Sequence, residues 1–335
     1  MEADLKDRSK RRRERDAAAE RGTKGADDLM RCDLHVHSWY SGPADLPVLK
    51  HMGRECYSEP GAVYEQARRR GMDLVTLTDH DSIEGALALA PRPRVFVSEE
   101  VTVLLPEGRQ LHVNVFDLTE RQHERIQTFR RDPEALFAYL AEERLPAAVN
   151  HLFSALTGDR ALADLRLPLG RLPLIETLNG SMPESHNQYA RRVGRTAGMA
   201  PVGGSDSHTL AGVGRAFTTV RGARTREEFL EGLRRGLTVP SGRSGSYARL
   251  TGEVVRIFAA AYREAAHEGA GRLLAALALG PLLPLLPLFT LGIHLHEVQF
   301  GNRYFRGFQR AFGWPADRPV VPGAAGAPVR SLGQA

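Results

Sequence analysis

Two histidines near the N-terminus of the chain are spaced as metal ligands on a strand would be. The segment RCDLHVHSWYSG, residues 31–42, places His35 and His37 two residues apart. Because side chains alternate between the two faces of a β-strand, both imidazole rings would point to the same side and could reach one ion. The pair is also compatible with two polar residues that share a strand face. A metal site would need further ligands from the rest of the chain.

Histidine and carboxylate side chains recur where further strands are expected to end. They occur in TDHD (78–81), SEE (98–100), LHV (111–113), NH (150–151) and GSDSH (204–208). Parallel α/β folds place their sites at the carboxyl ends of strands, so these residues should converge there. Their mixture of imidazole and carboxylate suits borderline divalent ions such as zinc, manganese or iron. The candidate ligands are His35, His37, His80, Glu100, His112, His151, Asp206 and His208.

Each of these pieces also has a plain structural explanation. A single histidine at a strand end is more often a hydrogen-bonded core or surface residue, and TDHD or GSDSH alone could form a turn with an aspartate cap. Five such pieces at successive strand ends, opened by D-x-H-x-H, favour one shared site. Within VFVSEEVTV, strand alternation separates Glu99 from Glu100. We expect Glu100, which shares its face with Ser98 and Thr102, to be the ligand.

Short apolar runs alternate with helical stretches from residue 31 to residue 242, which indicates a parallel-strand α/β barrel or a doubly wound sheet. Helices are expected to begin at Pro60, at Pro133 and behind Thr225, where Glu228 would complete a capping box. A further helix is expected over residues 245–268. The expected strands cover residues 31–37, 73–80, 94–105, 111–116, 146–151, 173–180, 201–208 and 216–220.

The composition is that of a folded intracellular protein. The chain has 335 residues, of which 42% are hydrophobic and 25% charged, enough for one large domain with appendages. Its net charge of +5 comes almost wholly from arginine, as GC-rich coding would produce, so it does not indicate nucleic-acid binding. Only two cysteines, Cys32 and Cys56, argue against a disulfide framework. Because residues 1–28 contain no apolar signal core, we expect a cytoplasmic location.

Four regions are expected along the chain. They are a charged, disordered leader (1–29), the barrel (30–243), a helix plus hydrophobic segment (244–300) and a basic tail rich in proline and glycine (301–335). The segment Leu273–His296 has no formal charge, although Gly280 and three prolines interrupt it. It would be either an anchor in the inner face of a membrane or a hydrophobic hairpin buried against the barrel or a second subunit.

Four motifs of the chain resemble those of one known family. DLHVH, TDHD, NH and GSDSH are similar, in this order, to the motifs of the PHP (polymerase and histidinol phosphatase) domain. The binuclear amidohydrolases also begin with H-x-H, but many of them bridge their metals with a carboxylated lysine, and this chain has no lysine after Lys50. The PHP resemblance covers about residues 31–240. It implies a distorted (β/α)7 barrel, here with a C-terminal helical, hydrophobic extension.

The same resemblance implies two or three divalent ions, manganese, zinc or iron, at three sites. The first site would use His35, His37, Glu100 and Asp206, the second Glu100, His112 and His151, and the third His80 and His208. A further ligand of the third site usually follows H-x-H; the corresponding stretch here is SGPAD, residues 41–45, so Asp45 is expected to replace it. Asp33 is expected to orient a ligand rather than to bind metal.

The function implied is that of a metal-dependent phosphoesterase of the phosphatase or 5′–3′ exonuclease type. His208 or His80 would transfer a proton to the leaving oxygen, and Arg215 would either hold the substrate phosphate or form a structural ion pair. The expected substrate is a nucleotide or a short 5′-phosphorylated oligonucleotide, because no aromatic and basic stripe suits long duplex nucleic acid. Two alternatives remain. One is a membrane-associated metal-binding regulatory module with little turnover, which contacts the membrane through residues 273–296; the other is a metal-dependent hydrolase of a cell-envelope precursor.

Overall fold

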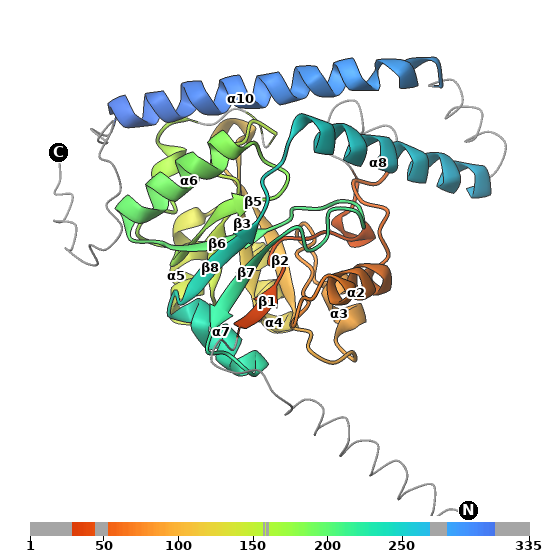
Figure 1. Ribbon diagram of the computed structural model, residues 1–335. Helices are drawn as coiled ribbons and strands as arrows, with labels where there is room; N and C mark the ends of the chain where they lie inside the picture. The colour runs from red at the N-terminus through yellow and green to blue at the C-terminus, as the bar shows by residue number, and fades with distance from the viewer. Residues whose placement is uncertain (1–28, 44–52, 157, 159–160, 269–279, 312–335) are drawn as a thin grey trace, which may run out of the picture.

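Strands form the interior of the molecule and helices cover it (Figure 1). The computed structural model describes residues 29–43, 53–156, 158, 161–268 and 280–311. The strands are β1 (Leu29–Cys32), β2 (Ser98–Leu104), β3 (Gln110–Phe116), β4 (Ala147–Val149), β5 (Leu174–Asn179), β6 (Ala200–Gly204), β7 (Ala216–Arg221) and β8 (Thr238–Gly242). The α-helices are α2 (Pro60–Arg69), α3 (Glu84–Leu89), α4 (Glu120–Thr128), α5 (Pro133–Glu142), α6 (Glu184–Ala197), α7 (Arg226–Arg234), α8 (Tyr247–Glu268) and α10 (Leu286–Ala311). Short 3-10 helices are η1 (Trp39–Ser41), η2 (Pro106–Gly108), η3 (Asp164–Arg166) and η4 (Gly280–Leu285).

The regular strands form two sheets. β2 to β6 make a five-stranded sheet in chain order, in which β2, β3 and β4 are antiparallel neighbours and β4, β5 and β6 are parallel. β1, β7 and β8 make an antiparallel three-stranded sheet. The arrangement is therefore less parallel than expected. The connection from β2 to β3, residues 105–109, is too short for a crossover between parallel strands, which needs a dozen residues or more.

The strands expected over residues 31–37 and 73–80 are largely irregular segments. Side chains there accept the hydrogen bonds of amides that would otherwise pair with a neighbouring strand. The Asp79 carboxylate, for example, accepts from the amide of Ser38 at 2.6 Å. Because such side-chain bonds compete with the ladder between strands, the regular pairing stops where they begin.

Isolated bridges connect these irregular segments to the two edges of the five-stranded sheet. Val36 pairs with Ser207, which follows β6, and His80 pairs with Glu100 in β2. The amide of Thr78 donates to the carbonyl of Val36 at 2.9 Å. The α/β architecture is as expected, but the regular strands of the described residues do not close into one continuous seven-stranded barrel.

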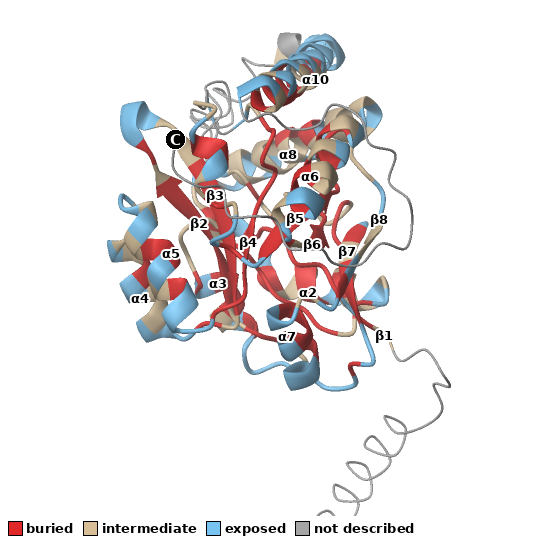
Figure 2. Cartoon of the chain, turned by 90° about the vertical axis from the view of Figure 1, so that its left-hand side faces the viewer, coloured by how far each residue is buried: buried red, intermediate tan, exposed pale blue. Residues whose placement is uncertain are grey.

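Three apolar clusters fill the space between strands and helices, which leaves the strands buried and the outer sides of the helices exposed (Figure 2). The largest lies between the five-stranded sheet and helices α4, α5, α6 and α10. The second joins β1 and β7 to α7, and the third contains α2 and α3. Three helices begin as the sequence predicts: α2 and α5 start with proline, and Thr225 and Glu228 form the capping box of α7.

The hydrophobic extension takes part in the core on one side. α10 contributes Phe300, Phe305 and Phe308 to the largest apolar cluster. The Phe305 ring stacks on Tyr189 of α6, with ring centroids 4.1 Å apart. These three phenylalanines lie beyond the segment 273–296, so they do not test whether that segment is buried against the barrel. Within its described part, Leu286 is buried against Val254 and Phe258 of α8. Residues 273–279 lie outside the described chain. α10 also runs to Ala311, past the boundary expected at residue 300.

α10 is in close contact with both α6 and α8. A Cβ at Gly301 would lie 2.2 Å from His186 Nε2 of α6, so glycine is needed where the two helices meet. The hydroxyls of Thr251 in α8 and Thr290 in α10 are 2.7 Å apart. No helix in the described part of the chain has both the length and the apolar character that crossing a bilayer requires.

We expect Phe308→Ala to lower the free energy of unfolding by about 3–5 kcal/mol, because the ring is fully buried and its removal leaves a cavity. Leu288→Ala on the exposed side of the same helix, where the side chain is 66% exposed, should change it by less than about 0.5 kcal/mol. Urea unfolding followed by circular dichroism measures both. A negligible effect of Phe308→Ala would contradict the packing of α10 against the core.

Candidate metal centre

The carboxylate of Glu100, in β2, lies at the centre of the candidate site. The side chain is fully buried, and its Oε2 atom faces three histidines. Oε2 lies 3.1 Å from His35 Nε2, 3.4 Å from His37 Nε2 and 3.4 Å from His80 Nδ1. The irregular segments after β1 and before α3 thus bring their histidines to the same oxygen.

The other oxygen of Glu100 faces a second group of ligands. Oε1 lies 3.3 Å from His112 Nδ1 and 3.3 Å from His151 Nε2, and it accepts a hydrogen bond from the Asn150 side-chain amide at 2.7 Å. His112 is in β3, which pairs with β2, and His151 follows β4, which pairs with β3. One carboxylate therefore stands between two sets of imidazoles.

Asp206, directly after β6, completes the first group. Its Oδ1 atom lies 3.4 Å from His37 Nε2 and 3.5 Å from His35 Nε2. The Asp206 amide donates to the His35 carbonyl at 2.6 Å, so the two segments are in contact along their backbones. A Cβ at Gly204 would lie 2.3 Å from the Cβ of His35, and this close approach requires glycine.

Glu55 is a carboxylate at the site that sequence reasoning missed. Its Oε1 atom lies 3.2 Å from His208 Nε2, and its Oε2 atom lies 3.6 Å from His80 Nε2. Glu55 thus places a carboxylate beside His80 and His208, the two histidines expected at the third site. Asp45, the carboxylate expected there, lies outside the described residues and stays a prediction. A search of every acidic residue between the H-x-H motif and the helix start at Pro60 would have included it.

Glu176, in β5, is a second carboxylate that sequence reasoning missed. Its Oε1 atom lies 2.9 Å from His35 Nδ1, and its Oε2 atom accepts from the His151 amide at 2.9 Å. A carboxylate on the second ring nitrogen of a ligand histidine fixes the tautomer and orientation of that ring. The signal in the sequence was a single glutamate within the apolar strand PLIETLNG.

The Asp33 carboxylate accepts hydrogen bonds from backbone amides and not from the ring of a ligand histidine. It accepts hydrogen bonds from the amides of His35, Ser205 and Gly214 at 3.3, 2.8 and 2.7 Å. These bonds connect the H-x-H segment with the loop that carries Asp206. Asp33 therefore positions ligands, as expected, but it does so through the chain and without touching an imidazole.

Glu99 and Glu100 point to opposite faces of β2, as strand alternation predicts. The Glu99 carboxylate lies 2.8 Å from His123 Nδ1 and accepts from the Gln127 side-chain amide at 2.8 Å, away from the cluster. His123 thus serves as the partner of a buried carboxylate.

Two candidate ligands sit where the chain leaves its strand with a positive φ angle. The values are 25° for His151 and 49° for Asp206, and Asp81, next to His80, has 52°. Such values are uncommon for residues other than glycine and are concentrated at functional sites. The sharp turns at these strand ends direct the side chains inward.

Burial and mutual charge set the protonation states of the cluster. Burial opposes ionisation of Glu100, but the positive charges of His35 and His80 hold its pKa well below its usual range. Burial is the main cause that lowers the pKa of His37 to about 3 and the pKa of His112 to about 4. Ionised carboxylates and neutral imidazoles are the forms that bind metal ions.

Several buried ring nitrogens of the cluster make no hydrogen bond, although carboxylate oxygens lie 3.2 to 3.4 Å from three of them, as is expected of ligands around a shared ion. Buried polar atoms ordinarily have hydrogen-bond partners. Among the described residues, those buried without one include His37 Nε2, His112 Nδ1, His151 Nδ1 and His208 Nε2. Overlapping sets of three donor groups also lie within 4.8 Å of one another, for example His35, His37 and Glu100. The donors suit a centre of several divalent ions, with manganese, zinc and iron all acceptable.

A cavity of about 520 Å³ opens onto the cluster. It is bordered by Glu55, by the ligand candidates other than His35 and His37, and by neutral side chains such as Gln110, Ser154 and Leu156. This volume lies in the range that binds small molecules. Arg215 is not among the residues that border it, and the Arg215 guanidinium donates to the Ala211 carbonyl at 2.9 Å. Its role as a phosphate clamp stays a prediction.

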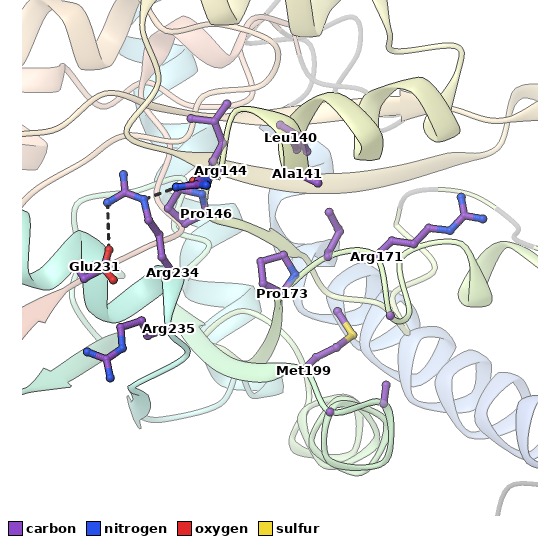
Figure 3. A pocket seen from close by; sticks show the side chains of 15 residues that line it. Leu140, Ala141, Arg144, Pro146, Arg171, Pro173, Met199, Glu231, Arg234 and Arg235 are labelled. Atoms are coloured by element: carbon purple, nitrogen blue, oxygen red, sulfur yellow. Dashed lines mark hydrogen bonds and ion pairs between the residues drawn. The ribbon is translucent and has the colours of Figure 1, made fainter. Parts of the chain in front are cut away.

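A larger hollow of about 870 Å³ lies before the parallel strands β4, β5 and β6, at the end opposite their carboxyl termini (Figure 3). Arginines border it, but the guanidinium groups of Arg171 and Arg235 point away from each other. Arg234 donates to the Arg144 carbonyl at 3.4 Å and lies 3.9 Å from Glu231. Without convergent donors or any of the candidate ligands, this hollow is not the candidate site.

The structure thus brings together every predicted ligand that it describes, and Glu55 in addition. We expect Glu55→Gln to lower the metal content by about one equivalent per chain, because an amide cannot replace the anionic oxygen between His80 and His208. Asp45→Asn should leave the content unchanged. Elemental analysis after dialysis measures the metal content of both variants. A loss of metal in Asp45→Asn but not in Glu55→Gln would mean that Asp45, and not Glu55, is the ligand beside His80 and His208.

Glu176→Gln should weaken metal binding by about 10- to 100-fold, because it removes the charge that orients His35. Competition with a chelating dye measures the affinity. Glu99→Gln is the matched control, since Glu99 is also fully buried and pairs with a histidine but faces away from the cluster. An equal loss of metal affinity in both variants would mean that removing any buried charge weakens metal binding, and that the orientation of His35 by Glu176 is not the cause.

Comparison with known sequences gives one family match and one partial relative. A family model described as PHP-associated matches residues 184–238. An uncharacterized protein of Methanocaldococcus jannaschii is 32% identical over 72 residues, which are 22% of this chain and 41% of that protein. The chain therefore matches about two fifths of the length of this curated relative.

Comparison with solved structures finds distant likenesses. PsfC of Pseudomonas syringae is 16% identical, with 62% of this chain and 95% of that chain covered, at a TM-score of 0.42. A Bifidobacterium adolescentis protein with a provisional assignment as a metal-dependent phosphoesterase is 15% identical, with 55% and 88% covered, at a TM-score of 0.39. Neither score is high enough to support an assignment. The PHP-associated match, however, includes Asp206 and His208, and it confirms the PHP resemblance of the chain over the last of the four motifs.

Proposed function

We propose that the protein is a metal-dependent phosphoesterase that hydrolyses a phosphate ester of a nucleotide or of a short 5′-phosphorylated oligonucleotide. The observation that carries this proposal is the position of Glu100, whose two oxygens face two different sets of histidines. A carboxylate placed in this way would help both sets of histidines to hold divalent ions, and centres of two such ions stabilise the charges that develop in phosphoryl transfer. The two sheets and the irregular segments between them would be the distorted barrel that carries the centre.

The donor atoms divide into three groups around Glu100 and Asp206. The first group is His35, His37, Glu100 and Asp206; the second is Glu100, His112 and His151; the third is Glu55, His80 and His208. Bound divalent ions would supply a Lewis acid for the phosphate oxygens and a bound water acidic enough to act as a nucleophile near neutral pH.

His208, in the third group, is also a candidate general acid. Burial disfavours charge on His208, but the adjacent Glu55 carboxylate raises the pKa of His208 to about 9. The His208 ring borders the cavity, where its protonated form could give a proton to the leaving oxygen. With a third ion, His80 and His208 would serve as ligands instead.

The cavity supports a small or short substrate. No lysine or arginine is among the described residues that border it, so the charge of a phosphate group would be balanced at the metal centre itself. A long duplex would need contacts between many phosphates and basic side chains, which this cavity does not offer. A nucleotide or the 5′ end of a short oligonucleotide fits the available volume.

Manganese-loaded protein should act on at least one of three substrates. The expected product is inorganic phosphate from adenosine 3′,5′-bisphosphate or histidinol phosphate, and either inorganic phosphate or a nucleoside 5′-monophosphate from a 5′-phosphorylated trinucleotide. Asp206→Asn should reduce the rate by at least about 100-fold, because a direct ligand matters at least as much as the partners that orient ligands. Asp117→Asn is the matched control, since Asp117 also has a positive φ, of 57°, but pairs with Arg226 on the surface. Metal-loaded protein that is inactive on all three substrates would favour the regulatory module.

A further inference from the structure

Exposed apolar side chains gather on the C-terminal helices. Seven of the eleven large hydrophobic side chains that are exposed in the described chain belong to α8, η4 and α10. They are Val255, Leu283, Leu285, Leu288, Phe289, Leu291 and Leu295. Single exposed hydrophobic residues are common on proteins, but a group of them marks an interaction site. We therefore expect this surface to bind another molecule or a membrane.

The exposed residues of α10 lie on one face of the helix. Leu288 and Leu295 are seven residues apart, about two turns, and Arg306 is eighteen residues from Leu288, which is five turns. The opposite side of the helix buries Phe305 and Phe308 against the core. The outer face, pale blue in Figure 2, is therefore apolar in its first half and cationic in its second.

The exposed charged side chains that the structure describes on these helices are all positive. The exposed arginines of the two helices are Arg256 and Arg263 in α8 and Arg303, Arg306 and Arg310 in α10. Among the described side chains of α8 and α10, no acidic one is exposed. Glu297 is buried, Glu253 is half-buried, and the half-buried Glu264 forms an ion pair with Arg54.

The geometry points to the surface of an anionic lipid bilayer as the occupant of the outer face of α8 and α10. A helix that lies in the interface presents apolar side chains to the acyl region and basic side chains to anionic headgroups, which is the combination found here. Sequence continuity agrees, because the uncharged run Leu273–His296 includes the exposed leucines of η4 and of the first half of α10. A second copy of the chain fits less well, since it would bring arginines toward arginines, and the described side chains of these helices include no exposed carboxylate to pair them.

Sedimentation of the full-length protein with vesicles tests the proposal directly. We expect binding to vesicles of phosphatidylcholine mixed with phosphatidylglycerol, weaker binding to phosphatidylcholine alone, and a decrease with added salt. The double variant Leu288→Glu with Leu295→Glu should lower the partition coefficient by at least about tenfold. Leu237→Glu is the matched control, because Leu237 is 50% exposed and follows α7, at the other end of the molecule (Figure 1).

Each other outcome overturns the proposal. Wild-type protein that stays in solution with both vesicle types excludes a lipid surface, and so does a double variant that binds as the wild type does. A concentration-dependent dimer in analytical ultracentrifugation that the same double variant abolishes would assign the face to a second copy. Metal content, measured on the same samples, shows that the variants are folded. The lipid result is independent of phosphate release, so either proposal can fail alone.

Discussion

The carboxylate of Glu100, fully buried among five imidazole rings, is the constraint that organises the rest of the structure. Ring nitrogens of five histidines lie within 3.4 Å of its two oxygens, and these histidines come from four stretches of the chain. An uncompensated charge at this depth would cost several kcal/mol. Each of these segments must therefore bring its histidine to the Glu100 carboxylate and direct the imidazole ring toward it.

The segments around the site have irregular backbone geometry instead of continuing as regular strands. Asp33 and Asp79 accept hydrogen bonds from backbone amides of the segment that follows β1. His151 and Asp206 leave their strands with positive φ angles. Irregularity and ligand geometry thus have one cause, because the side-chain acceptors that fix the ligands also interrupt the ladder that would close a regular barrel.

The C-terminal helices support the same loops from outside. Glu253 of α8 accepts a hydrogen bond from the hydroxyl of Thr209, next to His208. Glu297 of α10 accepts from the amide of Ala155, in the loop that begins at His151. The extension beyond residue 243 is therefore joined to two ligand-bearing loops by buried or half-buried carboxylates, while its outer face is free for another role.

Local rules determined much of this protein from sequence alone. The period of two in β2 selected Glu100 over Glu99, and the capping box of Thr225 and Glu228 located the start of α7. These features depend on neighbours within a few residues, so a linear sequence contains them. The residue types that converge on the site could be read in the same way, because ligand chemistry restricts them to a few.

Only the tertiary structure decided which distant residues became partners. Glu176 meets His35 across 141 positions of the chain, and Glu55 reaches His208 across the cluster. The same holds for the antiparallel pairing of β2 with β3 and for the division of α10 into a buried and an exposed face. Such contacts depend on how whole elements pack, and no local pattern specifies which of several nearby carboxylates will arrive at a given imidazole.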